Sequence, residues 1–115
     1  MKTATKSATK TPGCPIAKAS EIIGDTWTIL IIRELLGGTK RFNEIQQDLI
    51  SSCSQHCINS RTLTERLKKL EKENVLERTV VAHEMPPRVE YTLTKKGKDL
   101  SKVIEALKNF GEKHL

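Results

Sequence analysis

Apolar residues recur every three or four positions along several stretches of this chain, and turn signals separate the stretches. Such spacing is typical of amphipathic helices, whereas two β-branched runs around Met85-Pro86-Pro87 are typical of strands joined by a turn. The sequence therefore predicts five helices and one β-hairpin. The helices are expected over residues 15–23, 26–36, 42–49, 59–73 and 95–115, and the strands within 76–84 and 88–94.

The helix expected over residues 59–73 has two different sides. At 100° per residue, Leu63, Leu67 and Leu70 fall within about 60° of one another and form an inward face. The other side stays out of the core and carries most of the charge of this segment. It comprises the charged residues Arg61, Glu65, Lys68 and Lys72, with Thr62, Thr64 and Lys69 flanking them.

Both ends of this helix carry capping signals. Asn59 is a good N-cap, so Ser60, Arg61 and Thr62 lie in the first turn, near free backbone N–H groups. Asn74 tolerates the left-handed conformation that ends many helices. Donors, hydroxyls and positive charge suit a DNA major groove, where arginine reads guanine and threonine contacts phosphate or a thymine methyl group. The alternative is the ordinary solvated face of an amphipathic helix.

Composition and charge narrow the class of partner. The 115 residues suffice for one domain with a modest core. With 20 Lys and Arg against 14 Asp and Glu, the formal charge is +6 and the pI is near 9.4. Excess positive charge favours polyanionic partners such as nucleic acid or acidic membranes. All aromatic residues except Tyr91 fall on apolar helical faces, so a stacking platform for single strands is not evident and duplex DNA is the expected ligand.

The sequence predicts a soluble, cytoplasmic protein with one folded domain. No apolar run approaches the roughly 20 residues of a membrane span, and the N-terminus lacks the apolar segment of a signal peptide. Three cysteines without a secretion signal indicate reduced thiols. Residues 1–13 hold three lysines and no acidic residue, so we expect a disordered basic tail before a domain over residues 14–115.

The order of the predicted elements indicates the fold class. A short helix, a connection and a basic amphipathic helix form a helix-turn-helix, and the hairpin that follows would be a wing. Pro86 and Pro87 stiffen the wing tip, and Arg88 lies beside it to reach a phosphate or the minor groove. The expected fold is α+β and mostly α: a winged helix-turn-helix of about five helices and a two- or three-stranded β-wing.

Five motifs occur in order along residues 14–115. They are Cys-Pro at 14–15, Gly-Asp-x-Trp at 24–27, Gly-x-x-Arg-Phe at 38–42, Leu-Thr-x-Arg-Leu-x-x-Leu at 63–70 and Pro-Pro-Arg-Val-x-Tyr-x-Leu-Thr at 86–94. In combination they resemble the HxlR family of winged-helix transcriptional regulators. The resemblance implies a homodimer that binds a pseudo-palindromic operator, usually as a repressor and sometimes as an activator. It also implies that residues 59–73 are the recognition helix and 83–90 the wing.

Two features depart from the pattern of that family. The segment between Leu49 and Ile58 is longer than the usual link between the third helix and the recognition helix. A longer link affects the angle between the two helices, and therefore which side chains reach bases. Asn74 stands where the family usually has glycine, a milder change that asparagine tolerates.

These arguments give two sets of candidate residues, one for DNA and one for a partner subunit. The apolar stripe of the last predicted helix is expected to pack against its counterpart in a second subunit, with the first helix beside it; the alternative is that it covers its own domain. The DNA-binding candidates are Arg41, Asn59, Ser60, Arg61, Thr62, Thr64, Glu65, Lys68 and Arg88. The dimer candidates are Ile16, Leu100, Val103, Ile104, Leu107 and Phe110.

The cysteines suggest two kinds of control. Cys14 precedes Pro15 at a helix start, where the helix dipole and nearby Lys18 favour a thiolate that could react with an oxidant or electrophile. The HxlR resemblance agrees, because some relatives sense oxidants or electrophiles through this cysteine; the alternative is an inert, buried residue. Cys53, His56 and Cys57 form a local cluster that could hold zinc or copper, although a fourth ligand is not evident; the alternative is an inert or redox-active loop.

Other classes of protein fit less well. Gly37-Gly38 ends a helix without the Gly-Lys-Ser/Thr of a phosphate-binding loop, and nothing in the sequence brings a catalytic triad together. The chain is therefore not expected to be an enzyme, and no cofactor is expected. A winged helix used for protein contact is the second alternative, but its outer face would be expected to be acidic, whereas this one is net basic.

Overall fold

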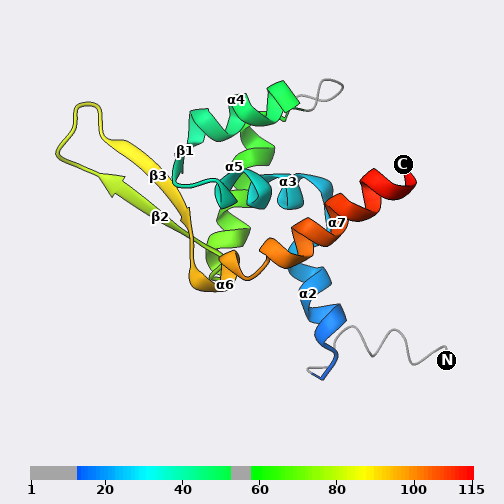
Figure 1. The fold of residues 1–115 in the computed structure, drawn as a ribbon. Helices are drawn as coiled ribbons and strands as arrows, with labels where there is room; N and C mark the ends of the chain where they lie inside the picture. Colours follow the sequence, from blue (N-terminus) through cyan, green and yellow to red (C-terminus); the bar gives the residue numbers. More distant parts are fainter. Residues whose placement is uncertain (1–12, 53–57) are drawn as a thin grey trace.

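The computed structural model describes residues 13–52 and 58–115 of the chain. Within them the chain forms six helices, one of which is a single turn, and three strands (Figure 1). In chain order these are α2 (Pro15–Ile23), α3 (Thr26–Leu36), β1 (Lys40–Arg41), α4 (Phe42–Ser52), α5 (Ser60–Lys72), β2 (Leu76–Val81), β3 (Arg88–Leu93), α6 (Lys95–Lys98) and α7 (Ser101–His114).

The three strands form one small antiparallel sheet with the order β1-β3-β2. Strand β3 is central, and its Tyr91 lies between Lys40 of β1 and Arg78 of β2. The β2–β3 hairpin projects from one side of the helices, whereas α7 lies on the opposite side (Figure 1). The expected fold, a winged helix-turn-helix with a wing of two or three strands, is confirmed.

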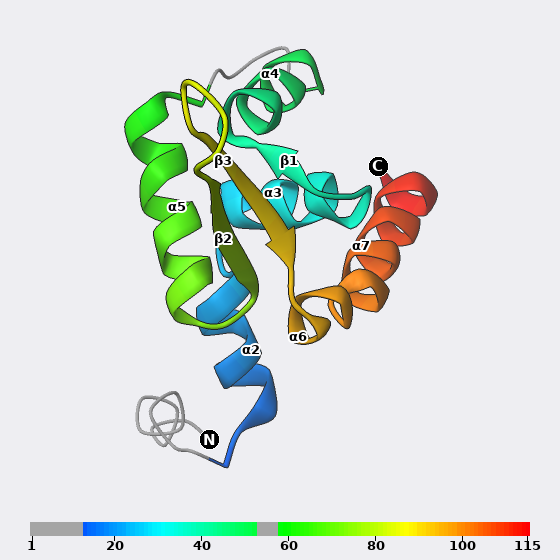
Figure 2. The same cartoon turned by 90° about the vertical axis from the view of Figure 1, so that its left-hand side faces the viewer.

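The hydrophobic core lies between the helices and the inner face of this sheet. In Figure 2 the sheet lies in front of α3, with α5 along one edge and α4 above. The predicted inward face of α5 is confirmed, because its three leucines are almost completely buried. The core residues are Ile31, Ile32 and Leu35 of α3, Ile45 and Leu49 of α4, Leu63, Leu67 and Leu70 of α5, and Ile58, Val75, Leu76, Tyr91 and Leu93.

Local capping explains where the helices begin and end. Asp25 precedes α3 and accepts a hydrogen bond from the backbone N–H of Thr28. After α5, Asn74 adopts a φ of 68°, the left-handed conformation predicted for it. The N–H of Val75 then donates to Leu70 and that of Asn74 to Glu71, which satisfies the last carbonyls of the helix in a Schellman motif.

Three details differ from the sequence prediction. Helix α4 continues to Ser52, past the predicted end at residue 49, which shortens the connection to α5. Strand β1 was not predicted, because it is only two residues long and depends on pairing with β3 far along the chain. The last predicted helix is divided at Asp99-Leu100 into α6 and α7.

The division between α6 and α7 follows from a close contact with the sheet. The N–H and hydroxyl of Thr94 both donate to the carbonyl of Val75, and Gly97 of α6 packs directly against the same carbonyl. This attachment fixes the direction of α6. The chain then turns at Leu100, so that Leu100 and Ile104 pack against the core.

The tail predicted over residues 1–13 lies, except for residue 13, outside the described residues. Along residues 13–52 and 58–115, none of the helices combines the length and the apolar character that crossing a membrane requires.

Candidate nucleic-acid interface

The outward side of α5 is exposed along its whole length, as predicted. The side chain of Arg61 is 88% exposed, and its Nε lies 3.4 Å from Glu65 one turn further along. Lys68 and Lys72 are also exposed, and within the described part of the chain neither side chain makes an ion pair or hydrogen bond. Thr62 and Thr64 are half-buried at the margins of this side. The helix therefore offers cations and donors to solvent.

The N-terminal turn of α5 is held by side chains on both sides of it. Asn59 Oδ1 accepts a hydrogen bond of 2.8 Å from the backbone N–H of Thr62, so Asn59 caps the helix as predicted. Gln46 of α4 donates from Nε2 to the Ile58 carbonyl at 3.2 Å and to the Ser60 hydroxyl at 3.3 Å. Asn59 and Ser60, both DNA-binding candidates, thus also position the helix.

Gln46 was missed by the sequence reasoning. Its function depends on where α4 lies relative to the start of α5, and local spacing does not give that arrangement. The only available signal was a polar residue directly beside the apolar face of the preceding helix, next to Ile45. Gln46 thus bridges α4 and the start of α5.

The body of α5 is attached to three other elements. Arg66 Nε lies 2.9 Å from Asp25 Oδ2, at the start of α3. Lys69 Nζ donates to the carbonyl of Glu21 in α2 at 2.8 Å, and Lys96 of α6 donates to the carbonyl of Glu73 at 2.7 Å. These contacts hold the helix at its middle and its C-terminal end. Arg66 and Lys69 therefore join α5 to other parts of the protein, although Lys69 itself is exposed.

The Asp25 carboxyl makes hydrogen bonds with Thr28 and an ion pair with Arg66 of α5. Burial alone would raise its pKa, but the hydrogen bonds from Thr28 and the positive charge of Arg66 outweigh burial and lower the pKa below its usual value of 3.8. Both oxygens are used, since Oδ1 accepts from the Thr28 N–H and Oδ2 from the Thr28 hydroxyl. The carboxylate therefore joins the start of α3 to α5.

The wing places Arg88 beside its tip, as predicted, but with two acidic partners. Arg88 Nη2 lies 2.9 Å from Glu84 Oε2, and Arg88 Nε lies 3.0 Å from Glu90 Oε2. Met85 at the tip is 89% exposed. Arg41 lies opposite Glu90 in the neighbouring strand, where its side chain is half-exposed and 3.8 Å from Glu44. The two candidate arginines outside α5 thus both have carboxylates beside them.

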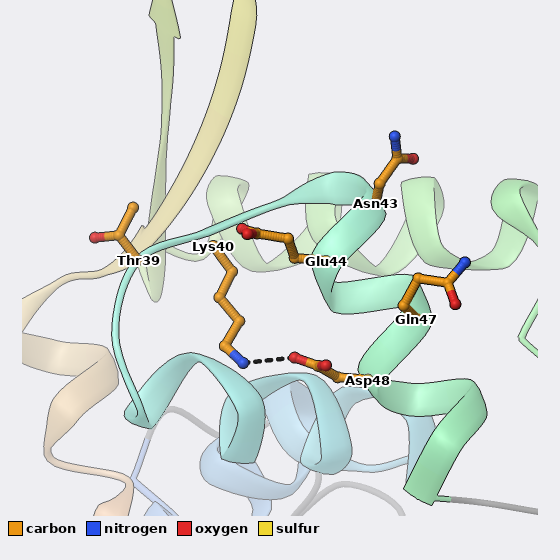
Figure 3. A pocket seen from close by; sticks show the side chains of 6 residues that line it. All are labelled: Thr39, Lys40, Asn43, Glu44, Gln47 and Asp48. Carbon is orange, nitrogen blue, oxygen red and sulfur yellow. Dashed lines mark hydrogen bonds and ion pairs between the residues drawn. The ribbon is translucent and has the colours of Figure 1, made fainter.

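A shallow open pocket of about 390 Å³ lies where β1 meets α4. Figure 3 shows Lys40 and Asp48 pointing toward each other across it, whereas Asn43 and Gln47 point outward. The hydrogen bond to Asp48 is the main reason that the pKa of the Lys40 amine lies above its usual value, and Glu34 at 3.6 Å adds to the effect. Lys40 therefore ties β1 to α3 and α4.

The apolar dimer candidates divide into two groups. Leu100 and Ile104 are half-buried and pack against the core of their own domain. The side chains that remain exposed are Ile16 in α2 and Val103, Leu107 and Phe110 in α7. A groove of about 780 Å³ between α3 and α7 adds the apolar side chains of Ile29, Leu30 and Leu36 to this region. The groove thus brings Ile104 and Leu107 of α7 together with these apolar side chains of α3.

The cysteines are described only in part. Cys14 occupies the N-cap position of α2, where it is half-buried, not in a disulfide, and makes no side-chain cap hydrogen bond. The predicted metal cluster of Cys53, His56 and Cys57 lies outside the described residues. Among residues 13–52 and 58–115, no group of three or more His, Cys, Asp or Glu side chains is arranged to hold a metal ion.

Comparison with known proteins agrees with this geometry. The profile of the HxlR-like helix-turn-helix family matches residues 22–115. The HTH-type transcriptional regulator YdeP of Bacillus subtilis is 39% identical over 102 residues, which span 89% of this chain and 74% of that protein. The relatives matched in sequence are named as transcriptional regulators, a class whose members are not typically enzymes.

Solved structures show the same fold. The redox regulator HypR in its oxidised form is 33% identical, with a TM-score of 0.75 over 89% of this chain and 98% of that chain. The reduced transcriptional regulator YodB of Bacillus subtilis is 35% identical, with a TM-score of 0.68 over 88% of this chain and 93% of that chain. The chain is a DNA-binding transcriptional regulator and belongs to the HxlR-like helix-turn-helix family.

Proposed function

We propose that the protein is a sequence-specific repressor that binds a pseudo-palindromic operator in duplex DNA as a homodimer. In this proposal α5 lies in the major groove and the β2–β3 hairpin reaches the adjacent backbone or minor groove. The observation that carries the proposal is the exposed side of α5, with Arg61, Lys68 and Lys72 directed to solvent on a helix held at both ends. The net charge of +6 favours the same ligand.

The main experiment selects bound sequences from random duplexes, using the purified protein with and without an oxidant. The expected product is one two-fold symmetric sequence whose half-sites lie about one helical turn, roughly 34 Å, apart. Binding to it should weaken steeply as salt concentration rises, because phosphate contacts release counterions. No preference among duplexes at moderate ionic strength, in either thiol state, would rule the proposal out.

Arg61 is proposed to read a base. Replacing Arg61 with alanine should then weaken binding to the selected operator by about 1–2 kcal/mol, because a bidentate contact to guanine is lost, and affect random duplexes much less. Fluorescence anisotropy titrations with both duplexes measure the difference. Lys102→Ala on α7 removes the same charge far from the wing and should change neither affinity by more than about twofold. An equal loss on both duplexes would make Arg61 a phosphate contact.

The exposed apolar residues of α7 are proposed to pack against a second subunit. Val103, Leu107 and Phe110 are 38%, 46% and 59% exposed, and Ile16 of α2 is exposed as well. Light scattering at micromolar concentration without DNA should give twice the chain mass of 12.9 kDa. Phe110→Glu should weaken the dimer about tenfold, whereas Met85→Glu on the wing should not, although it exposes the same charge. A monomeric mass for the unmodified protein would contradict the dimer.

Control by oxidants is proposed through Cys14. Two similar proteins support it: HypR is named a redox regulator, and YodB is described in a reduced form. Cys14 at the N-terminus of α2 is two residues before Ile16, one of the exposed apolar residues proposed for the dimer. In the selection experiment an oxidant should change the affinity of the unmodified protein and leave that of Cys14→Ser unchanged. An equal change of affinity in both proteins would show that a residue other than Cys14 reacts with the oxidant.

A further inference from the structure

The wing arginine is held between two carboxylates. Glu84 lies 2.9 Å from Nη2 of Arg88, and Glu90 lies 3.0 Å from its Nε, so two of the three guanidinium nitrogens have an acidic partner. Only about a third of each side chain is accessible, with values of 33% for Arg88, 40% for Glu84 and 29% for Glu90. This partial burial reduces the screening of the ion pairs by water and salt. The cluster carries one positive and two negative charges.

The two carboxylates differ in how firmly the fold holds them. Glu90 lies in the middle of β3, with Arg41 opposite it on one side and Thr79 on the other. Glu84 belongs to the connection between β2 and β3, next to the exposed Met85. Glu90 is therefore fixed by strand pairing, whereas Glu84 can move away from Arg88 without breaking the sheet. Glu84 is the partner that a competing anion would displace.

The charge of the cluster opposes simple attraction to DNA. Glu84 and Glu90 cancel the attraction that Arg88 alone would exert on a phosphate still separated from the protein by water, so Arg88 adds little to a loosely bound, sequence-independent complex. When α5 is seated and water is excluded, a phosphate beside the wing can accept hydrogen bonds from the guanidinium and replace Glu84. Arg88 then adds to DNA affinity only in the complex in which α5 is seated and water is excluded.

We propose that Glu84 is a specificity-determining residue, which holds Arg88 back from phosphate until the recognition helix is seated on its operator. This inference rests on the proposed DNA-binding function. If Glu84 acts in this way, Arg88 contributes to the difference between operator and random duplex and not equally to both. Glu84 acts through Arg88 and makes no contact with DNA itself.

The test compares the full-length protein with Glu84→Gln, a substitution that keeps the shape and removes the charge. Affinities for the selected operator and for a random duplex are measured between about 50 and 200 mM salt. Glu84→Gln should raise the affinity for random duplex about three- to tenfold, since each dimer has two wings and each released arginine gains one phosphate. The slope of log affinity against log salt should steepen by about 1–2, and the ratio of operator to random affinity should fall.

Two further variants separate this mechanism from a general effect of charge. Combining Glu84→Gln with Arg88→Ala should abolish the gain, because the released arginine is absent. Glu77→Gln makes the same charge change on an exposed residue of β2, at the end of the hairpin away from the tip, and should alter affinity less than about twofold. A gain that persists without Arg88, or an equal gain from Glu77→Gln, would overturn the inference.

Measurements on the unmodified protein distinguish a failure of the inference about Glu84 from a failure of the proposed DNA-binding function. One result is that the unmodified protein selects an operator and binds it in a salt-dependent way, while Glu84→Gln has the same affinity as the unmodified protein for operator and for random duplex. In that case the inference about Glu84 is wrong and the proposed function stands. If neither the unmodified protein nor any variant binds duplex DNA at low salt, the proposed function is wrong and the inference falls with it.

Discussion

Replacing Gly97 with alanine is expected to lower the free energy of unfolding by about 2–4 kcal/mol. A Cβ at this position would collide with the carbonyl oxygen of Val75 and press against Leu93, and the backbone oxygen cannot turn aside as a flexible side chain could. The same carbonyl accepts hydrogen bonds from Thr94, so moving it would also strain the attachment of α6 to β2. Urea denaturation followed by circular dichroism measures the loss.

Gly37→Ala is the matched control for this prediction. Gly37 is exposed at the end of α3 with a φ of −79°, and an added Cβ would lie 3.4 Å from the Glu34 carbonyl oxygen. Its free energy of unfolding should therefore change by no more than about 0.5 kcal/mol. Equal stabilities of the two variants would show that the contact between Gly97 and Val75 does not constrain the fold.

Replacing Asp25 with alanine is expected to cost about 2–3 kcal/mol of folding stability. The change removes the N-cap of α3 and the ion pair to Arg66 of α5, and it leaves the hydroxyl of the fully buried Thr28 without its acceptor. Asp25→Asn keeps an oxygen that can cap the helix and should cost only about 1 kcal/mol. Thermal and urea unfolding at neutral pH give both values.

The pH dependence of stability provides a separate check on Asp25. Its pKa is lower in the folded protein than the usual 3.8, so the unfolded chain binds the proton more readily. The stabilising contribution of the carboxylate is therefore complete above about pH 4 and is lost as the pH falls through the lower, folded pKa. Since the side chain is 38% exposed, solvent screening keeps this contribution modest.

Asp25→Asn removes the titrating group and should flatten this part of the curve. The difference in stability between the unmodified protein and Asp25→Asn should accordingly shrink between about pH 4 and pH 2. A difference that stays constant over that interval would mean that Asp25 does not titrate differently in the folded and unfolded states. Other acidic residues contribute equally to both proteins and cancel in the comparison.

Local patterns predicted most of the helices and the exposed side of α5. The three- and four-residue spacing of Leu63, Leu67 and Leu70 places all three on one face of a helix. When that face is buried, Arg61 and Lys68 on the other side point to solvent. Capping residues act on the turn next to them, so Asn59 and Asn74 could be assigned from the sequence. In each case the interaction joins residues a few positions apart.

Features that depend on distant residues were not predicted. Strand β1 exists because Lys40 pairs with Tyr91, and α6 separates from α7 because Gly97 meets Val75. Likewise, the bridge from Gln46 to the start of α5 depends on the packing of α4. The acidic neighbours of Arg88 are a different case, because both are close to it in the sequence. Glu90 follows two residues later on the same face of β3, whereas Glu84 reaches Arg88 only through the path of the β2–β3 connection.

The attachments of α5 to Gln46, Glu21 and Lys96 also bear on how such regulators diverge and can be redesigned. All of them use backbone groups or side chains away from the exposed residues, so Arg61, Lys68 and Lys72 can be exchanged with little penalty to the scaffold. A library randomised at those three positions should therefore remain largely well folded. With α5 in the major groove, as proposed, such a library is expected to yield variants that select new target sequences.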